Sequence, residues 1–230
     1  MRSDLPKVMH PLLGKPMLEY VLMAARLARA APVVVITGAA TPGVAECARG
    51  FGAEIAVQLV PRGTGDAVRW AHPHLNGFQG DIVVLCGDAP VVTGETITRL
   101  VALHRGERNA VTILTAQVPN PQGFGRIIRA EDGRVTRIVE EADASAHERA
   151  IGEVNSGAYC FAPDALFPQL DFLTSDNSQG EIYLTDVVGA LFREGRRVGA
   201  LSMGVPAAPL GINTVEELEE TERVLAARRG

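Results

Sequence analysis

One stretch indicates the fold class: residues 82–88, which read IVVLCGD. Apolar residues fill it without alternation as far as Cys86, which is typical of a strand covered on both faces of a sheet. Similar runs alternate along the chain with helical patterns. This order predicts an α/β fold, with a mixed, mostly parallel sheet flanked by helices. Such sheets bind ligands beyond the carboxyl ends of their strands, so Asp88 lies where we expect a site.

The expected elements follow from the length and period of each apolar run. We expect strands at Val33–Thr37, Glu54–Gln58, Ile82–Cys86, Ala110–Val118, Glu153–Phe161 and Arg197–Met203. We expect helices at 16–30, Gly43–Gly50, Gly63–Ala71, 94–105, Leu184–Glu194 and 214–230, the last beginning with a capping box of Thr214 and Glu217. An Asp-Gly turn between the strand-like runs Arg126–Ala130 and Arg134–Glu140 predicts a β-hairpin, a small β-rich portion within the α/β order.

The composition is that of an ordinary globular chain: 230 residues, 47% hydrophobic and 21% charged, with a net charge of −5. This balance argues against disorder, and the negative charge argues against nucleic-acid binding. Cys47, Cys86 and Cys160 are too scattered for a disulfide framework or a zinc site. Since no signal core or membrane-length apolar run is present, we expect a cytoplasmic protein with no membrane partner.

Several motifs in the first half of the chain could carry chemistry, and each also has a plain structural interpretation. Asp88 could bind Mg²⁺ or could cap a turn before Pro90. Lys7 could neutralise a phosphate or could be a solvated surface lysine. The glycines of Arg62–Gly65 could free backbone amides for a ligand, or the segment could be a loop with Thr64 as a helix cap.

The second half of the chain offers three further motifs. Gly123–Arg126 and Glu140 could hold a sugar, or could form a turn and part of a solvated acidic pair. Asn155–Gly157 places three residues that disfavour strands inside an expected strand, a conflict that often marks a functional site. Asn213 could be a turn residue or a neutral metal ligand. No catalytic base is evident, which fits a transfer reaction whose phosphate nucleophile is already ionised.

Together these motifs resemble one family, in family order. They are SDLPKV (3–8), GKPM (14–17), RGTG (62–65), GD (87–88), GFGR (123–126), EVNSG (153–157), QGEIYLTD (179–186) and GIN (211–213). Over essentially the whole chain they resemble the uridylyltransferase domain of the bacterial bifunctional N-acetylglucosamine-1-phosphate uridylyltransferases/glucosamine-1-phosphate acetyltransferases. The resemblance implies a Rossmann-like nucleotide-diphospho-sugar transferase fold. It also implies conversion of UTP and N-acetylglucosamine 1-phosphate into UDP-N-acetylglucosamine and pyrophosphate, with Mg²⁺ as cofactor.

The resemblance further implies roles for single residues. Asp88 and Asn213 would bind the metal, and Lys7 would act with Asp88 in catalysis by contacting phosphate. The other substrate-binding positions would be Gln58, Gly63 and Thr64 at the uracil edge, Gly125, Glu140 and Asn155 at the acetylated sugar with Tyr183 and Thr185 nearby, and Cys86 and Gly87 beside Asp88.

Three departures from the family qualify this prediction. The family's opening strand and its glycine-rich loop are expected just before Met1, and a β-helix acetyltransferase domain is expected after Gly230. Cys86 replaces a frequent tyrosine. We therefore expect residues 1–230 to be an N-terminally incomplete nucleotidyltransferase domain that folds poorly, turns over little and is monomeric, with trimers if a β-helix were attached. The alternatives are a related enzyme for another sugar or nucleotide, and a non-catalytic sugar-nucleotide-binding domain.

Overall fold

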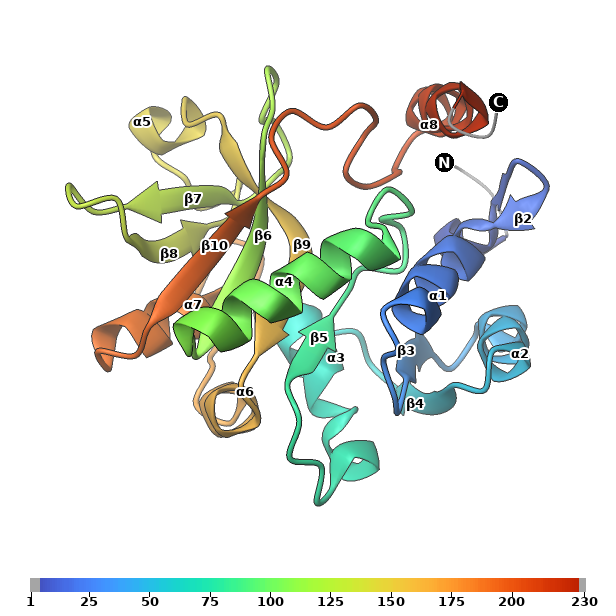
Figure 1. Ribbon diagram of the computed structural model, residues 1–230, viewed down its shortest axis with the longest axis horizontal. Helices are drawn as coiled ribbons and strands as arrows, with labels where there is room; N and C mark the ends of the chain where they lie inside the picture. The colour runs from blue at the N-terminus through green and yellow to red at the C-terminus, as the bar shows by residue number, and fades with distance from the viewer. Residues whose placement is uncertain (1–4, 228–230) are drawn as a thin grey trace.

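The computed structural model describes residues 5–227, which form one six-stranded sheet, two two-stranded sheets and flanking helices (Figure 1). The strands are β1 (Pro11–Leu12), β2 (Lys15–Pro16), β3 (Val34–Gly38), β4 (Glu54–Gln58), β5 (Ile82–Val84), β6 (Val111–Gln117), β7 (Arg126–Arg129), β8 (Val135–Val139), β9 (Glu153–Phe161) and β10 (Val198–Ser202). The helices are α1 (Met17–Leu27), α2 (Pro42–Gly50), α3 (Thr64–Arg69), α4 (Gly94–Glu107), α5 (Ala146–Arg149), α6 (Pro163–Leu170), α7 (Asp186–Arg193) and α8 (Val215–Ala227), with 3₁₀ helices η1 (Lys7–Met9) and η2 (His72–Leu75). The predicted class, a mixed α/β fold with helices flanking its sheets, is confirmed. The six-stranded sheet, however, is mostly antiparallel, since β10–β6 is its one parallel pair among the described strands.

The six-stranded sheet is built around β9. This strand pairs antiparallel with β5, β6 and β7, while β8 continues the sheet from β7 and β10 runs parallel to β6. The predicted hairpin is β7–β8, and Gly133 adopts a φ of +82° in its turn. The pairing of β6 with β9 shifts register between Ile113 and Thr115, opposite the motif Asn155–Gly157. The motif that disfavours a strand therefore lies at an irregularity of the sheet.

A separate parallel sheet of β3 and β4 lies beside α1 and α2, at the right of Figure 1. Leu18 and Leu22 of α1 and Val44 and Ala48 of α2 form its buried cluster, against which Val35 packs. Within residues 5–227, β3 has a strand partner on one edge only, and the same is true of β5. The two sheets thus each end on an edge that no described strand covers.

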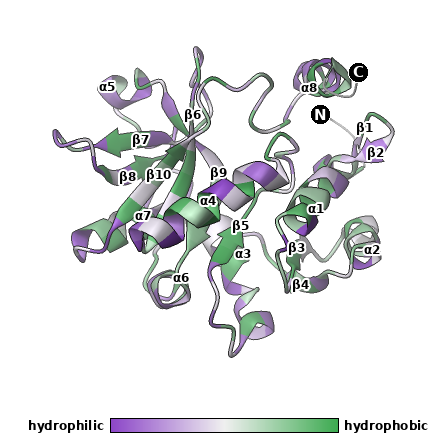
Figure 2. Ribbon diagram, viewed as in Figure 1, coloured by the Kyte–Doolittle hydropathy of each residue, from purple (hydrophilic) through white to green (hydrophobic). Residues whose placement is uncertain are grey.

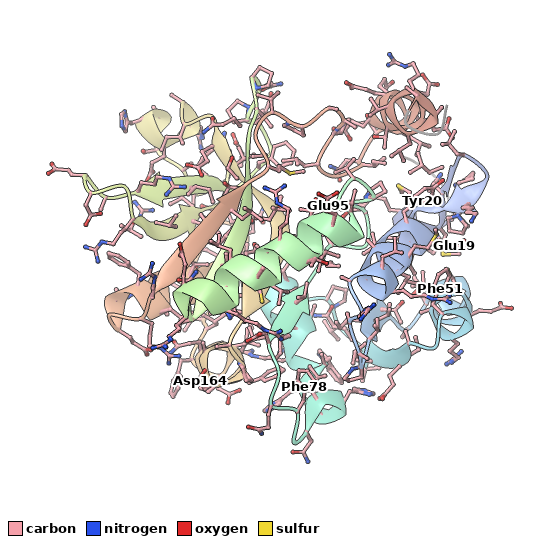
Figure 3. The ribbon with its side chains drawn as sticks, viewed as in Figure 1. Glu19, Tyr20, Phe51, Phe78, Glu95 and Asp164 are labelled. Carbon is pink, nitrogen blue, oxygen red and sulfur yellow. The ribbon has the colours of Figure 1, made fainter. Side chains whose placement is uncertain are left out.

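Apolar residues concentrate in the large sheet. Figure 2 shows its strands mainly as hydrophobic, whereas α8 mixes hydrophilic and hydrophobic residues. β6 is buried from Val111 to Ala116, and α4 packs over β6, β9 and β10. On the other side of the molecule, Tyr20, labelled in Figure 3 at the end of α1 nearest α8, donates a hydrogen bond to Leu12 O over 2.7 Å. That bond fixes the β1–β2 turn against α1.

Most predicted boundaries agree with the structure to within a few residues, and β4 and β9 have the predicted bounds. Several boundaries differ by two or three residues: β5 ends at Val84 rather than Cys86, the helix expected from Leu184 begins at Asp186, and the helix expected over 16–30 ends at Leu27. Sequence analysis missed β1–β2, α5 and α6. Residues 3–4 and 228–230, which belong to predicted segments, lie outside the described residues. Within residues 5–227, no helix combines the length and apolar character that crossing a bilayer requires.

Candidate functional site

Asp88, Lys7 and Asn213 meet at one point, although they are far apart in the sequence. Lys7 Nζ forms an ion pair with Asp88 Oδ2 and donates a hydrogen bond to Asn213 Oδ1 over 2.8 Å. Asp88 follows β5, Lys7 begins η1 and Asn213 precedes α8. The Asp88 carboxylate thus pairs with a cation rather than capping the turn before Pro90, and Lys7, although 42% exposed, is held by two oxygen atoms.

Backbone hydrogen bonds bring the Asn213 segment to Asp88. Ile212 N donates to Asp88 O over 3.1 Å. The predicted capping box of α8 is confirmed: Glu217 N donates to Thr214 Oγ1 over 3.1 Å, and Thr214 N donates to Glu217 Oε2 over 3.0 Å. The Glu217 carboxylate also accepts a hydrogen bond from Asn213 N over 2.6 Å. The first turn of α8 therefore fixes the backbone of Asn213, which lies close to Asp88 in space.

The oxygen atoms of Asp88 and Asn213 suit a hard cation such as Mg²⁺. Both lie within reach of the same ammonium nitrogen, so they are arranged around one cationic centre. The described residues contain no group of three or more His, Cys, Asp or Glu able to hold a metal ion. A Mg²⁺ bound through Asp88 and Asn213 would therefore take its remaining ligands from water and substrate phosphates, as this ion commonly does.

Cys86 and Gly87 connect Asp88 to the rest of the fold. Cys86 Sγ lies 3.5 Å from Gly157 O, and a Cβ atom on Gly157, whose φ is +77°, would lie 2.7 Å from that sulfur. A Cβ atom on Gly87 would lie 3.2 Å from Val8 of η1. Burial raises the pKa of Cys86 to about 11, and the charge of Asp88 adds to the effect, so the thiol stays protonated at neutral pH. The Cys86 thiol therefore lacks the thiolate form that a nucleophile needs.

A single backbone segment holds the loop before α3. Ile182 N donates to Arg62 O over 2.7 Å, and Gly65 N donates to Ile182 O over 2.8 Å. Two residues further on, Leu184 N donates to Thr64 Oγ1 over 3.0 Å, a bond between positions 120 residues apart. The RGTG and QGEIYLTD motifs are consequently joined by three hydrogen bonds, although they are far apart in the sequence.

Gly63 makes this close approach possible. Its φ is +104°, and a Cβ atom there would lie 2.5 Å from Ile182 O. Gly63 is also the residue that precedes α3, while the hydroxyl of Thr64 is used by Leu184 N. The interpretation of Thr64 as a helix cap is therefore wrong.

Gln58 lies at the end of β4 and is 9% exposed. Its side-chain Nε2 donates a hydrogen bond to Asp66 Oδ2 over 2.7 Å. Asp66 lies in the first turn of α3, and sequence analysis did not single it out. The contact joins two residues eight positions apart, so the Gly-rich loop between them is the only signal that could have suggested it.

Gly125, Glu140 and Asn155 lie together, as predicted for the sugar site. Asn155 N donates to Gly125 O over 2.8 Å, and a Cβ atom on Gly125 would lie 3.3 Å from Glu140 Oε2. Thr185 Oγ1 donates to Glu140 Oε1 over 2.8 Å. The four residues present a backbone carbonyl, a carboxylate, an amide and a hydroxyl, which are groups that can bind sugar hydroxyls.

The side-chain amide of Asn155 is held from both ends. Its Nδ2 donates to Tyr159 Oη over 2.6 Å, and its Oδ1 accepts from Gly157 N over 3.1 Å. Burial raises the pKa of Tyr159 well above its ordinary value, so this hydroxyl stays neutral. The orientation of the Asn155 amide is therefore fixed, and its second N–H meets no acceptor among the described residues.

Burial raises the pKa of Glu140, and the nearby charges of Asp186 and Asp143 add to this effect, while the Thr185 hydrogen bond opposes it. A cavity of about 840 Å³ opens beside Glu140 and is also lined by Tyr183 and Thr185, but its lining includes neither Gly125 nor Asn155. Tyr183 Oη donates to Gln179 Oε1 over 3.0 Å, and burial raises the Tyr183 pKa to about 12. Tyr183 and Thr185 thus lie near Glu140, as predicted.

Sequence analysis quoted Arg126 but assigned it no role. Its side chain is 1% exposed, and its Nη2 pairs with Glu141 Oε2 at 2.6 Å. The same Glu141 oxygen accepts from Gly123 N over 3.2 Å, and Arg126 Nη1 donates to Phe124 O. Glu140 and Glu141 are therefore not a solvated acidic pair: Glu140 accepts a hydrogen bond from Thr185, and Glu141 holds the loop that carries Gly125.

The contacts join most of the predicted residues. Cys86 and Gly157 link the Asp88 centre to Asn155, and the segment 182–185 links Thr64 to Glu140. Gln58 lies apart from this chain of contacts; its side chain bonds to Asp66. The arrangement offers a cationic centre at Lys7, a cluster of polar groups around Glu140 and Asn155, and a loop before α3 that is held by Ile182.

Comparisons with known proteins identify the family of the chain. A family model described as nucleotidyl transferase matches residues 2–204. The chain is 44% identical over 229 residues to the bifunctional protein GlmU of Pelobacter propionicus, 42% over 228 residues to that of Pelotomaculum thermopropionicum, and 41% over 230 residues to that of Bacillus subtilis. Each alignment covers 99% of this chain and 50% of the relative, so the chain spans about half the length of the curated relatives it matches.

Proposed function

Because the chain belongs to the nucleotidyl transferase family, we propose that it transfers a uridylyl group from UTP to N-acetylglucosamine 1-phosphate. The products are UDP-N-acetylglucosamine and pyrophosphate. The observation that carries the proposal is the convergence of Asp88, Lys7 and Asn213 at one centre, which Cys86 and Gly157 connect to the polar groups around Asn155.

The reaction needs positioning and charge stabilisation rather than a base. An oxygen of the sugar phosphate attacks the α-phosphorus of UTP in line with the bond to the bridging oxygen of the β-phosphate. The new P–O bond forms as the old one breaks, and pyrophosphate leaves with the electron pair. No proton is transferred, because the attacking oxygen is already ionised.

The residues of this chain divide the work. The Lys7 ammonium neutralises charge on the phosphates, while Asp88 and Asn213 would hold Mg²⁺, which when bound supplies further charge neutralisation. Glu140 accepts hydrogen bonds from sugar hydroxyls, and the remaining N–H of the Asn155 amide binds the sugar or its acetyl group. Both side chains are already oriented, which lowers the entropic cost of binding.

Asp88→Asn tests the centre, because it removes the charge and keeps the shape. We expect pyrophosphate release from UTP and N-acetylglucosamine 1-phosphate to fall on the order of a hundredfold or more, with an unchanged melting temperature. Asp132→Asn, in the exposed hairpin turn, is the matched control and should keep full turnover. Near-normal turnover in Asp88→Asn would contradict the assignment.

A substrate panel on the unaltered chain tests the specificity. UTP should be preferred to dTTP, and the acetylated amino sugar phosphate to glucose 1-phosphate. Higher turnover with either substitute would favour a related enzyme for another sugar or nucleotide.

One observation favours a second candidate, a domain that binds sugar nucleotides without turnover. Lys7 Nζ already pairs with both expected metal ligands, Asp88 and Asn213. Calorimetry with UDP-N-acetylglucosamine, run beside the pyrophosphate assay, separates the two functions. Binding without pyrophosphate release would support the second candidate.

A further inference from the structure

We propose that Asp66 sets the base specificity of the site by fixing the side-chain amide of Gln58. This inference rests on the proposed function, since it assigns the means by which a uracil nucleotide is chosen. Asp66 contacts no reacting atom, so it is a positioning residue.

The contact between the two side chains has only one polarity. A carboxylate accepts hydrogen bonds and cannot donate them, so the amide must turn its nitrogen toward Asp66. Gln58 Nε2 donates to Asp66 Oδ2 over 2.7 Å, which leaves Oε1 as the other end of the amide. Among the described residues no donor reaches this Oε1, so its capacity to accept a hydrogen bond is unused.

An acceptor at this place selects between pyrimidines. Uracil carries a hydrogen on N3, whereas N3 of cytosine has none and is itself an acceptor. The backbone N–H of Gly63 has no partner among the described residues, so it can donate to the O4 atom of uracil; in cytosine this position carries an amino group. An acceptor at Gln58 and a donor at Gly63 therefore complement N3–H and O4 of uracil. In cytosine they would meet an acceptor and an amino group instead.

Asp66 is itself held from behind. Arg69 Nη1 lies 3.9 Å from Asp66 Oδ1, and Arg69 Nε donates to Leu170 O, at the end of α6, over 2.9 Å. Asp66 also lies in the first turn of α3, where the helix dipole favours a carboxylate. The series of contacts from Leu170 through Arg69 and Asp66 thus keeps the side-chain amide of Gln58 from rotating.

Asp66→Asn tests the proposal with almost no change of shape. An asparagine amide can donate as well as accept, so Gln58 becomes free to present either its oxygen or its nitrogen. Calorimetry on this chain measures the dissociation constants of UTP and CTP. The preference for UTP over CTP should fall on the order of tenfold, which corresponds to the loss of one charge-assisted hydrogen bond. Part of this change should be a gain in CTP affinity, which loss of folding cannot produce.

Glu54→Gln is the matched control, because Glu54 lies on the same strand and its carboxylate pairs with His74 at the surface. That variant should keep the nucleotide ratio of the unaltered chain. An unchanged ratio in Asp66→Asn, with UTP still preferred and pyrophosphate still released, would overturn this inference alone. If the unaltered chain binds neither nucleotide, the proposed function and this inference both fail.

Discussion

The large sheet and the β3–β4 sheet support opposite ends of the candidate site, and they differ in how completely their strands are covered. β9 has strand partners on both edges, and its neighbour β6 is buried from Val111 to Ala116. β3 pairs with β4 alone among the described strands, and only Thr37 of β3 is buried. The proposed sugar pocket lies on the first sheet, whereas Gln58 lies at the end of the second.

The difference shows how stability is distributed around the site. Asn155 is part of a strand whose backbone is hydrogen-bonded on both sides, so it is fixed by the core of the protein. Gln58 depends on the packing of α1 and α2 and on the side chain of Asp66. We therefore expect the nucleotide end to open more readily than the sugar end.

The largest expected effect is the difference in lost stability when one isoleucine of each sheet is replaced by alanine. Ile113 of β6 is 0% exposed, and Ile113→Ala should lower the free energy of unfolding by about 3–4 kcal/mol through lost burial and a cavity. Ile36 of β3 is only partly buried, so Ile36→Ala should cost about 1 kcal/mol. Urea unfolding of both variants measures the losses, and equal values would break the comparison.

A smaller effect is expected from the buried arginine of the sugar loop. Arg126→Met should lower the free energy of unfolding by about 2–3 kcal/mol, because hydrogen bonds to charged groups are lost in a buried place. It should also raise the KM for the sugar phosphate more than the KM for UTP, since Gly125 loses its support.

Arg134→Met is the control for that measurement, because Arg134 pairs with Asp132 at the exposed turn of the same hairpin. It should change stability much less than Arg126→Met does. If both variants lose the same free energy of unfolding, burial does not explain the contribution of Arg126 to stability.

The smallest effect concerns two adjacent carboxylates with opposite pH behaviour. Burial raises the pKa of Glu140 in the folded state, so its ionisation opposes folding as the pH rises above about 4.3, the ordinary value. Glu140→Gln should therefore stabilise the protein at pH 7, and this gain should vanish at lower pH where glutamates are protonated in both states. Sugar affinity should fall at the same time.

The Arg126 hydrogen bond lowers the pKa of Glu141, so its charge stabilises the fold above the ordinary pKa and that contribution is lost as the pH falls. Glu141→Gln should consequently destabilise the protein at pH 7 and have less effect in acid. Melting temperatures of both variants across pH 4–7 test the signs, and shifts of the same sign would contradict this account.

Much of the fold could be predicted because buried strands and amphipathic helices leave a clear period in the sequence. The bounds of β9 and the capping box of α8 are examples. Two missed helices also carried readable signals. Ser145 and Glu148 form a capping box at α5, and Pro163 occupies the first turn of α6, where its fixed φ favours a helix start.

The candidate site was less predictable, because its contacts join distant positions. Residues with unusual backbone needs, such as Gly63 and Gly157, were visible in the sequence as breaks in local rules. The partners of Arg126 and Asp66 were not, since an arginine or aspartate in a helix or strand looks the same whether it is solvated or paired. Only the three-dimensional arrangement shows that Glu140 and Glu141 have different partners.

The contact of Cys86 with Gly157 has an evolutionary consequence. A side chain at 157 would require a strained left-handed backbone and would meet the sulfur at 2.7 Å. A larger residue at 157 therefore requires a change at position 86, 71 residues away, whereas position 86 can vary while 157 stays glycine. A lineage could enlarge position 157 only after shrinking position 86 and moving β9, and Asn155, two residues away, would move with it.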